Sequence, residues 1–159
     1  MNMKNRIREL RTNAHYTQLQ LQMAFHIDQA DISKVESEQK ELSIEICKQA
    51  ALFFHTSMDY LVYLTDIPQP HERNNQPFSP ENLEKRAKEV AFLRAKKYTQ
   101  KDLEQLIHMN QSNCSKVENG SRHYTLAQCK KLAFYLNTSI DYICYLTDNP
   151  APYPFSDSF

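Results

Sequence analysis

An internal repeat is the feature that most constrains how this chain can fold. Residues 15–70 align without a gap on residues 97–152, so the offset is 82 (97 minus 15) throughout. Self-similarity at one fixed distance indicates that a single structural plan satisfies both segments, and duplication of a whole domain is the simplest origin. Among the positions of the first copy that recur unchanged are Tyr16, Thr17, Gln18, Leu21, His26, Gln29, Ser33, Lys34, Val35, Glu36, Asp59, Tyr60, Tyr63, Leu64, Thr65 and Asp66.

The repeat predicts two domains, residues 1–66 and residues 80–149, followed by a C-terminal tail over residues 150–159. Between them, residues 67–79 are expected to form a linker, because this region is rich in proline and has no apolar periodicity. A flexible segment of about 14 residues can reach about 45 Å when fully extended. One chain could therefore hold both domains on two neighbouring sites.

Hydrophobic spacing predicts five short helices in each copy and no alternating strand, so the expected fold class is all-α. In the second copy, Pro80 fits the first turn of a helix. Gly120, the only glycine of the chain, follows the third helix, where a left-handed residue often ends a helix. The expected N-terminal caps of the last four helices are Thr99, Asn110, Thr125 and Ser139.

The segment NQSNCSKVENG, residues 110–120, is almost wholly polar although it lies between two apolar helices. Only Cys114 and Val117 can contribute to a core. The other side chains carry amide, hydroxyl and cationic groups, which hydrogen-bond base edges and phosphates. Since this helix follows a capped helix across a tight turn, the pattern predicts a helix-turn-helix, whose second helix enters the major groove of DNA.

These features resemble the Cro and lambda-repressor-like helix-turn-helix regulators, also called the xenobiotic-response-element family. The resemblance rests on the Thr-Gln pairs at 17–18 and 99–100, the runs ISKVE at 32–36 and CSKVENG at 114–120, and the segments SMDYL and SIDYI. It covers both copies. It implies two tandem five-helix lambda-repressor-like DNA-binding domains joined by the proline-rich linker.

The resemblance also implies which residues contact DNA. Gln18 and Gln100 open the supporting helices, while Gln29 and Gln111 open the recognition helices. In phage repressors glutamines so placed cooperate, one on a phosphate and on its partner and the other bidentate to adenine, and that amide chemistry is sound in itself. The remaining expected contacts are Ala30, Asp31 and Lys34 in the first copy, and Ser112, Asn113, Ser115, Lys116, Asn119 and Arg122 in the second.

Two features depart from the family. The inter-helix turn has His26 and His108 where glycine is frequent, and we expect the turn to be kept because histidine can adopt a positive φ. Residues 28–41 carry five acidic and two basic side chains, a net charge of minus three, whereas residues 110–123 carry one acidic and two basic, a net charge of plus one. We therefore hypothesise that the second copy is the stronger DNA reader. The first would be weaker, differently specific, or used for protein contacts.

Other residues leave alternatives open. Tyrosines spaced three apart in the last helix of each copy fit either core packing or an inter-domain or dimer contact; they are Tyr60, Tyr63, Tyr142 and Tyr145. The basic residues of the first helix touch phosphate or form a solvated face; they are Lys4, Arg6, Arg8 and Arg11. The cysteines are expected to be reduced core residues, with a redox switch at Cys114 as the alternative; they are Cys47, Cys114, Cys129 and Cys144.

The function expected from these patterns is that of a sequence-specific transcriptional regulator, a bacterial or phage repressor, which is located in the cytoplasm with the nucleoid. Its partner would be double-stranded DNA bearing an asymmetric pseudo-palindromic operator, and a homodimer is possible. No enzyme, cofactor, metal site, small-molecule domain or membrane span is predicted, because no catalytic set, phosphate loop, metal-ligand spacing or long apolar run appears. The alternative is a protein-interaction module, such as an antitoxin, antirepressor or immunity component.

Overall fold

The computed structural model describes residues 3–157, so residues 1, 2, 158 and 159 of the predicted first domain and tail lie outside it. Over the described range the chain forms ten α-helices and no strand, which confirms the all-α prediction. The extended backbone there includes one isolated antiparallel bridge, between Thr65 and Phe155.

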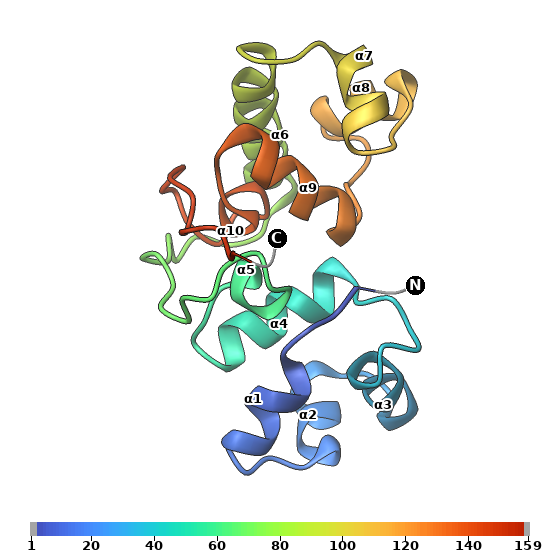
Figure 1. Cartoon of the computed structure of the whole chain (residues 1–159), viewed down its shortest axis with the longest axis vertical. Helices are drawn as coiled ribbons and strands as arrows, with labels where there is room; N and C mark the ends of the chain where they lie inside the picture. The colour runs from blue at the N-terminus through green and yellow to red at the C-terminus, as the bar shows by residue number, and fades with distance from the viewer. Residues whose placement is uncertain (1–2, 158–159) are drawn as a thin grey trace. The chain divides into compact units, whose positions relative to one another are not determined.

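The described chain divides into two compact units (Figure 1), one formed by residues 3–70 with 154–157 and the other by His71–Tyr153. The first unit contains α1 (Ile7–Asn13), α2 (Gln18–Phe25), α3 (Gln29–Glu36), α4 (Ile44–Phe53) and α5 (Met58–Leu61). The second contains α6 (Pro80–Ala95), α7 (Gln100–Leu106), α8 (Gln111–Glu118), α9 (Leu126–Leu136) and α10 (Ile140–Ile143). These units differ from the two predicted domains, because residues 71–79 pack with the second unit and residues 154–157 with the first.

Short polar side chains start most of the helices, as the sequence predicts. Thr99, Asn110, Thr125 and Ser139 each accept a hydrogen bond from a backbone N–H in the first turn of the helix that follows. Pro80 occupies the first turn of α6 behind the cap residue Ser79. Because these signals are local, the starts of the helices could be predicted from the sequence alone.

A tight turn with a left-handed residue joins the two helices of each helix-turn-helix. His26 has a φ of 55° and His108 a φ of 56°, which confirms the expected positive φ at both histidines. The second helix of each pair is then held against the first, since α2 packs on α3 and α7 packs on α8. The turn therefore places α3 and α8 in the same local arrangement in both units.

Each unit has its own apolar core. The fully buried apolar side chains of the first unit include Leu21, Val35, Leu42, Met58, Leu61 and Leu64, and those of the second include Leu103, Ile107, Leu126, Leu132 and Ile140. All four cysteines are buried. The fully buried apolar residues that lie in helices include members of α2, α3 and α5 in the first unit and of α7, α9 and α10 in the second.

Two tyrosines at the end of the first unit, one in α5 and one just after it, enclose an arginine. The guanidinium of Arg6 lies 4.1 Å from the ring centroids of both Tyr60 and Tyr63, and it also binds Asp66 at 3.1 Å. A guanidinium between two aromatic faces gains cation–π attraction while its edges keep polar partners. The sequence analysis did not suggest a contact with an arginine for these tyrosines, but Tyr142 and Tyr145 of the second unit are buried, as core packing requires.

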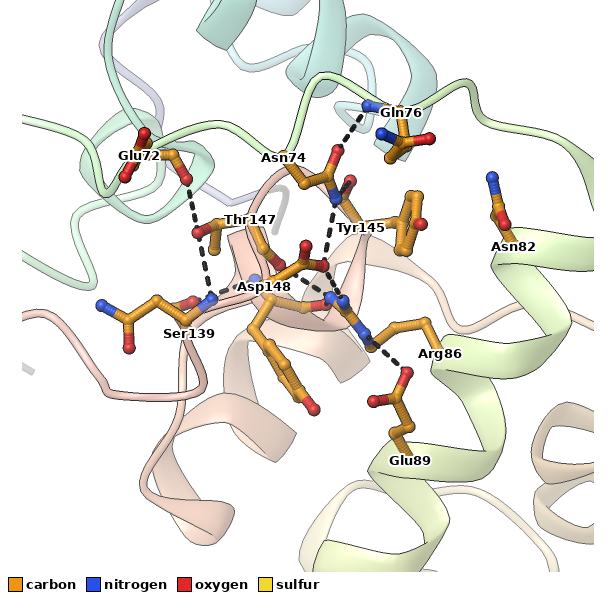
Figure 2. A network of polar contacts seen from close by, with 12 residues as sticks. Glu72, Asn74, Gln76, Asn82, Arg86, Glu89, Ser139, Tyr145, Thr147 and Asp148 are labelled. Carbon is orange, nitrogen blue, oxygen red and sulfur yellow. Dashed lines mark hydrogen bonds and ion pairs between the residues drawn. The ribbon is translucent and has the colours of Figure 1, made fainter.

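The second unit repeats this arginine site with Arg86, which is only 3% exposed. Its guanidinium lies 4.1 Å from the ring of Tyr142 and 4.8 Å from that of Tyr145, and one of its nitrogens is 2.5 Å from Asp148 (Figure 2). Arg86 follows Arg6 by 80 residues, whereas the first helices align at an offset of 83. The arginine of the second unit therefore lies about one helical turn before the position that aligns with Arg6. Alignment of the two copies does not reveal that the two arginines correspond.

Candidate nucleic-acid interface

The helices α3 and α8 each bury two apolar side chains and expose most of their other side chains. Ile32 and Val35 are buried in α3, and Cys114 and Val117 are buried in α8, as predicted for the second copy. The predicted contact residues that are exposed are Gln29, Ala30, Lys34, Gln111, Ser112, Ser115, Lys116, Asn119 and Arg122, and those that are half-buried are Asp31 and Asn113. Each unit thus presents one polar helix face to solvent.

A buried ion pair fixes the C-terminal end of α3. The guanidinium of Arg11 binds both carboxylate oxygens of Glu36, at 2.6 and 3.0 Å, and the Glu36 side chain is only 2% exposed. This hydrogen bond raises the pKa of Arg11 above its ordinary value, against the opposing effect of burial. Gln18 adds a third contact, because its Nε2 donates to the same carboxylate at 3.1 Å. The three residues link α1, α2 and α3.

The second unit has the same network at the equivalent residues. Arg94 binds the two carboxylate oxygens of Glu118 at 2.9 and 2.7 Å, and Gln100 donates to Glu118 at 2.8 Å. The hydrogen bond to Glu118 raises the pKa of Arg94. Sequence reasoning missed this network. Its signal was present, since the arginine, the glutamine and the glutamate all recur in the two copies.

The network gives Gln18 and Gln100 a partner inside the protein. Their Nε2 atoms bond to Glu36 and Glu118, so each amide is oriented before any ligand arrives. The predicted contact of these glutamines with a phosphate and with the first glutamine of the recognition helix stays a prediction.

A second pair of contacts orients the half-buried polar residue of each outward face. In the first unit Lys40 lies 3.0 Å from Asp31 Oδ1, and in the second Arg122 donates to Asn113 Oδ1 at 2.5 Å. Lys40 and Arg122 are 82 residues apart, as are Asp31 and Asn113, so the contact is the same in both units. Lys40 was not among the predicted contact residues, although its offset from Arg122 was visible in the sequence.

The N-termini of the two outward helices differ. Asn110 caps α8 through its side chain, and Glu104 accepts a hydrogen bond from the backbone N–H of Gln111 at 2.8 Å. In the first unit Asp28 makes no capping hydrogen bond, and Gln22 stands in place of Glu104. A carboxylate at a helix N-terminus is stabilising, but it also takes up an N–H group that could bind an anion.

The charge difference between the outward faces persists once the ion pairs are counted. Adding Arg11 to residues 28–41 changes the net charge from minus three to minus two, and adding Arg94 to residues 110–123 changes it from plus one to plus two. Glu104 lowers the second value to plus one. The second unit remains the more favourable one for a polyanion.

Two of the four basic residues that were expected in the first helix are used inside the first unit. Arg6 lies between the two tyrosines and Arg11 binds Glu36, whereas Lys4 and Arg8 are exposed. Only the last two could meet a phosphate without breaking an internal contact.

The environment of Cys114 is that of an unreactive thiol. Burial raises the pKa of Cys114 from 9.0 to about 11, with a smaller contribution from the nearby Glu118 carboxylate. Little thiolate then exists at neutral pH, and the thiolate is the reactive form. The thiol serves as a core contact of α8.

Comparison with known proteins agrees with this geometry. A helix-turn-helix family model matches the chain twice, over residues 7–61 and over residues 91–143. The chain belongs to the Cro/C1-type helix-turn-helix family. The first match of the family model runs from the start of α1 to the end of α5, and the second ends with α10. No curated protein and no solved structure showed significant similarity to the chain.

Membership of this family points to DNA binding and to a role in the regulation of transcription. Within the described residues no helix is both long and apolar enough to cross a membrane. Over the same range, no group of three or more His, Cys, Asp or Glu side chains is arranged to hold a metal ion.

Proposed function

We propose that the protein is a sequence-specific repressor of the bacterial or phage kind, of the xenobiotic-response-element type, which inserts α3 and α8 into the major groove of double-stranded DNA. The observation that carries this proposal is the outward polar face of α3 and α8, fixed in both units by two apolar side chains and one buried carboxylate. Base readout requires side chains held at defined positions. The family match over both units supports the same function.

The exposed residues of these faces supply the chemistry of readout. Gln29 and Gln111 are the first residues of α3 and α8, and a primary amide can bind adenine through two hydrogen bonds. Lys34 and Lys116 lie further along the same exposed faces and can neutralise phosphates. We assign the glutamines to base recognition and the lysines to positioning on the backbone.

The two units should contribute unequally. The face of α8 has the more positive surroundings, and Ser112 and Asn113 replace the Ala30 and Asp31 of α3. A negative charge close to DNA opposes binding, whereas hydroxyl and amide groups do not. We expect the second unit to provide most of the affinity, and the operator to be an asymmetric pseudo-palindrome because its two halves meet different side chains.

Selection from genomic DNA tests this function. The purified protein would be incubated with sheared DNA of its source organism at near-physiological salt, and the bound fragments would be sequenced. A Gln111→Ala, Lys116→Ala variant would be the matched control, since both residues are exposed and their replacement leaves the core intact. Enrichment of a few fragments that share a motif, lost in the variant, is the expected result. Equal recovery of all fragments by both proteins would oppose the proposal.

A second candidate function is a protein-interaction module, and an apolar patch on α2 favours it for the first unit. Leu19 is 52% exposed and Met23 is 69% exposed, whereas the equivalent residues of α7 are Lys101 and Gln105. Exposed apolar side chains on a polar surface often mark a contact with another protein. In this case the first unit would bind a partner, as an antitoxin, antirepressor or immunity component does.

Substitutions in this patch test the second candidate. Replacing Leu19 and Met23 with the Lys and Gln of the second unit should leave DNA recovery unchanged if the patch serves a partner protein. Pull-down experiments with this variant and the parent protein would then identify the partner by its loss.

A further inference from the structure

The turn that follows the last helix of each unit presents polar groups to a neighbouring segment of chain. We call residues 64–66 of the first unit and residues 146–148 of the second the acceptor turns. Both have the sequence Leu-Thr-Asp, and both follow a tyrosine with a positive φ, 63° at Tyr63 and 69° at Tyr145. Their threonines are buried, with 0% exposure at Thr65 and 1% at Thr147.

In the second unit, residues 72–74 occupy the acceptor turn (Figure 2). Thr147 Oγ1 donates to the carbonyl oxygen of Glu72 at 2.7 Å, and the backbone N–H of Asn74 donates to the carbonyl oxygen of Leu146 at 3.3 Å. The Asn74 side chain also donates to Asp148 at 3.3 Å. These contacts join a segment before α6 to the end of the same unit.

In the first unit, residues 154–156 occupy the acceptor turn in the same way. Thr65 Oγ1 donates to the carbonyl oxygen of Pro154 at 2.6 Å, and the backbone N–H of Ser156 donates to the carbonyl oxygen of Leu64 at 2.9 Å. The Ser156 hydroxyl donates to Asp66 at 2.9 Å. Ser156 is itself buried, at 6% exposure.

The two sets of contacts correspond bond for bond, with an amide as the side-chain donor in one and a hydroxyl in the other. Residues 72–74 and 154–156 are separated by the same 82 residues as the two acceptor turns, although their sequences, Glu-Arg-Asn and Pro-Phe-Ser, share no residue. Recognition therefore depends on the backbone and on one side-chain donor at the third position. The segment that follows the first repeat completes the second unit, and the segment that follows the second repeat completes the first.

We propose that each acceptor turn is a docking site for an extended segment with a side-chain hydrogen-bond donor at its third residue, and that residues 154–156 are the occupant of the first. The first unit is then complete only when the C-terminal segment is bound to it, and the chain connects the two units twice, at residues 70–71 and at residues 153–154. This inference concerns the folding of the units and is independent of DNA binding.

Hydrogen exchange of truncated chains tests the proposal. A chain that ends at Tyr153 lacks the segment, and a chain that ends at Asp157 keeps it and serves as the control. Removing three hydrogen bonds from the acceptor turn should make amide exchange at residues 57–66 faster by about tenfold or more, while residues 139–148 exchange at the control rate. Adding a peptide of residues 151–159 to the shorter chain should restore slow exchange.

A milder pair of variants keeps the test decisive if the shorter chain fails to fold. Ser156→Ala should accelerate exchange only at residues 57–66, and Asn74→Ala only at residues 139–148. Unchanged exchange at residues 57–66 in the chain ending at Tyr153, or equal acceleration at both acceptor turns in the Ser156→Ala variant, would overturn the proposal.

Discussion

A single carboxylate in each unit, from Glu36 or Glu118, holds the outward helix against the two helices that precede it. Glu36 is almost fully buried and satisfies both the guanidinium of Arg11 and the amide of Gln18. Taking a charge out of water is costly, so such a pair contributes little net stability compared with an apolar contact. Removing one partner is different, because the other charge is then left without compensation.

The first prediction concerns this pair. Glu36→Gln and Glu118→Gln should each destabilise their unit by about 3 kcal/mol, because the partly buried arginine loses its counter-charge. Urea unfolding measures the loss. Glu41→Gln, at an exposed position, is the control and should change stability by less than about 0.5 kcal/mol. Equal effects of the three substitutions would contradict the assignment.

The second prediction concerns base preference and rests on DNA binding by both units. Lys40 pairs with one carboxylate oxygen of Asp31, so the other oxygen can accept a hydrogen bond from a base. Arg122 donates to the amide oxygen of Asn113, so the NH₂ group of Asn113 can donate to a base. An acceptor suits the amino groups of cytosine or adenine, and a donor suits guanine or thymine oxygens.

Exchanging the side chains of Asp31 and Asn113 should therefore exchange the base preferences of the two units. Asp31→Asn and Asn113→Asp should each change the selected base at one operator position by about 1–3 kcal/mol of discrimination and leave the other positions unchanged. Selection from a random DNA library measures this. Unaltered motifs in both variants would show that neither side chain reads a base.

The third prediction concerns pH. The ordinary pKa of the Cys114 thiol is 9.0, and burial raises it to about 11 in the folded protein. Between these pH values the unfolded chain releases the thiol proton and the folded chain keeps it, so stability falls as pH rises. The loss is up to about 3 kcal/mol.

Cys114→Val should reduce this alkaline loss, and thermal unfolding between pH 7 and pH 11 measures it. The difference in melting temperature between the variant and the parent should be constant below pH 8 and should shift in favour of the variant above pH 9. Parallel curves over the whole range would show that the thiol does not contribute.

The chain takes up a left-handed conformation two residues after the third helix of each unit. Gly120 has a φ of 88°, and a Cβ placed there would lie 2.7 Å from Cγ of Glu84 in α6. The equivalent residue of the first unit is Glu38, with a φ of 64°. The first unit therefore carries a strain that the second avoids.

The fourth prediction follows from this difference. Gly120→Ala should destabilise the second unit by about 1–2 kcal/mol, and Glu38→Gly should be neutral or should stabilise the first unit by up to about 1 kcal/mol. Glu38→Ala is the control for the lost charge, and chemical denaturation measures all three. A Gly120→Ala variant as stable as the parent protein would mean that glycine is not required at this position.

Local signals made much of each element predictable from the sequence. The caps, the histidine turns and the glycine after α8 depend on residues within a few positions of one another, and the structure confirms them. The arginine sites were not predictable from the repeat, because Arg86 enters from a turn earlier than the aligned position. The occupied acceptor turns were not predictable either, since backbone groups make most of the contacts and the two occupying segments share no residue.

For the whole molecule, we propose that two copies of one helix-turn-helix act within a single chain and contribute unequally to DNA binding. The copies share their internal networks, and on the outward faces Gln29, Ser33 and Lys34 recur while Ala30 and Asp31 are replaced by Ser112 and Asn113. Different side chains at two exposed positions of the outward helices are expected of a reader with two different half-sites.

The affinity of matched variants for one selected DNA fragment tests this claim most directly. Binding would be measured at several salt concentrations for the parent protein, for Gln29→Ala, Lys34→Ala and for Gln111→Ala, Lys116→Ala. We expect the second-unit variant to lose about tenfold or more in affinity, with a salt dependence weaker by about one phosphate contact, and the first-unit variant to lose less. Equal affinities of the three proteins would contradict DNA reading by α3 and α8, and equal losses in the two variants would contradict the unequal contribution of the units.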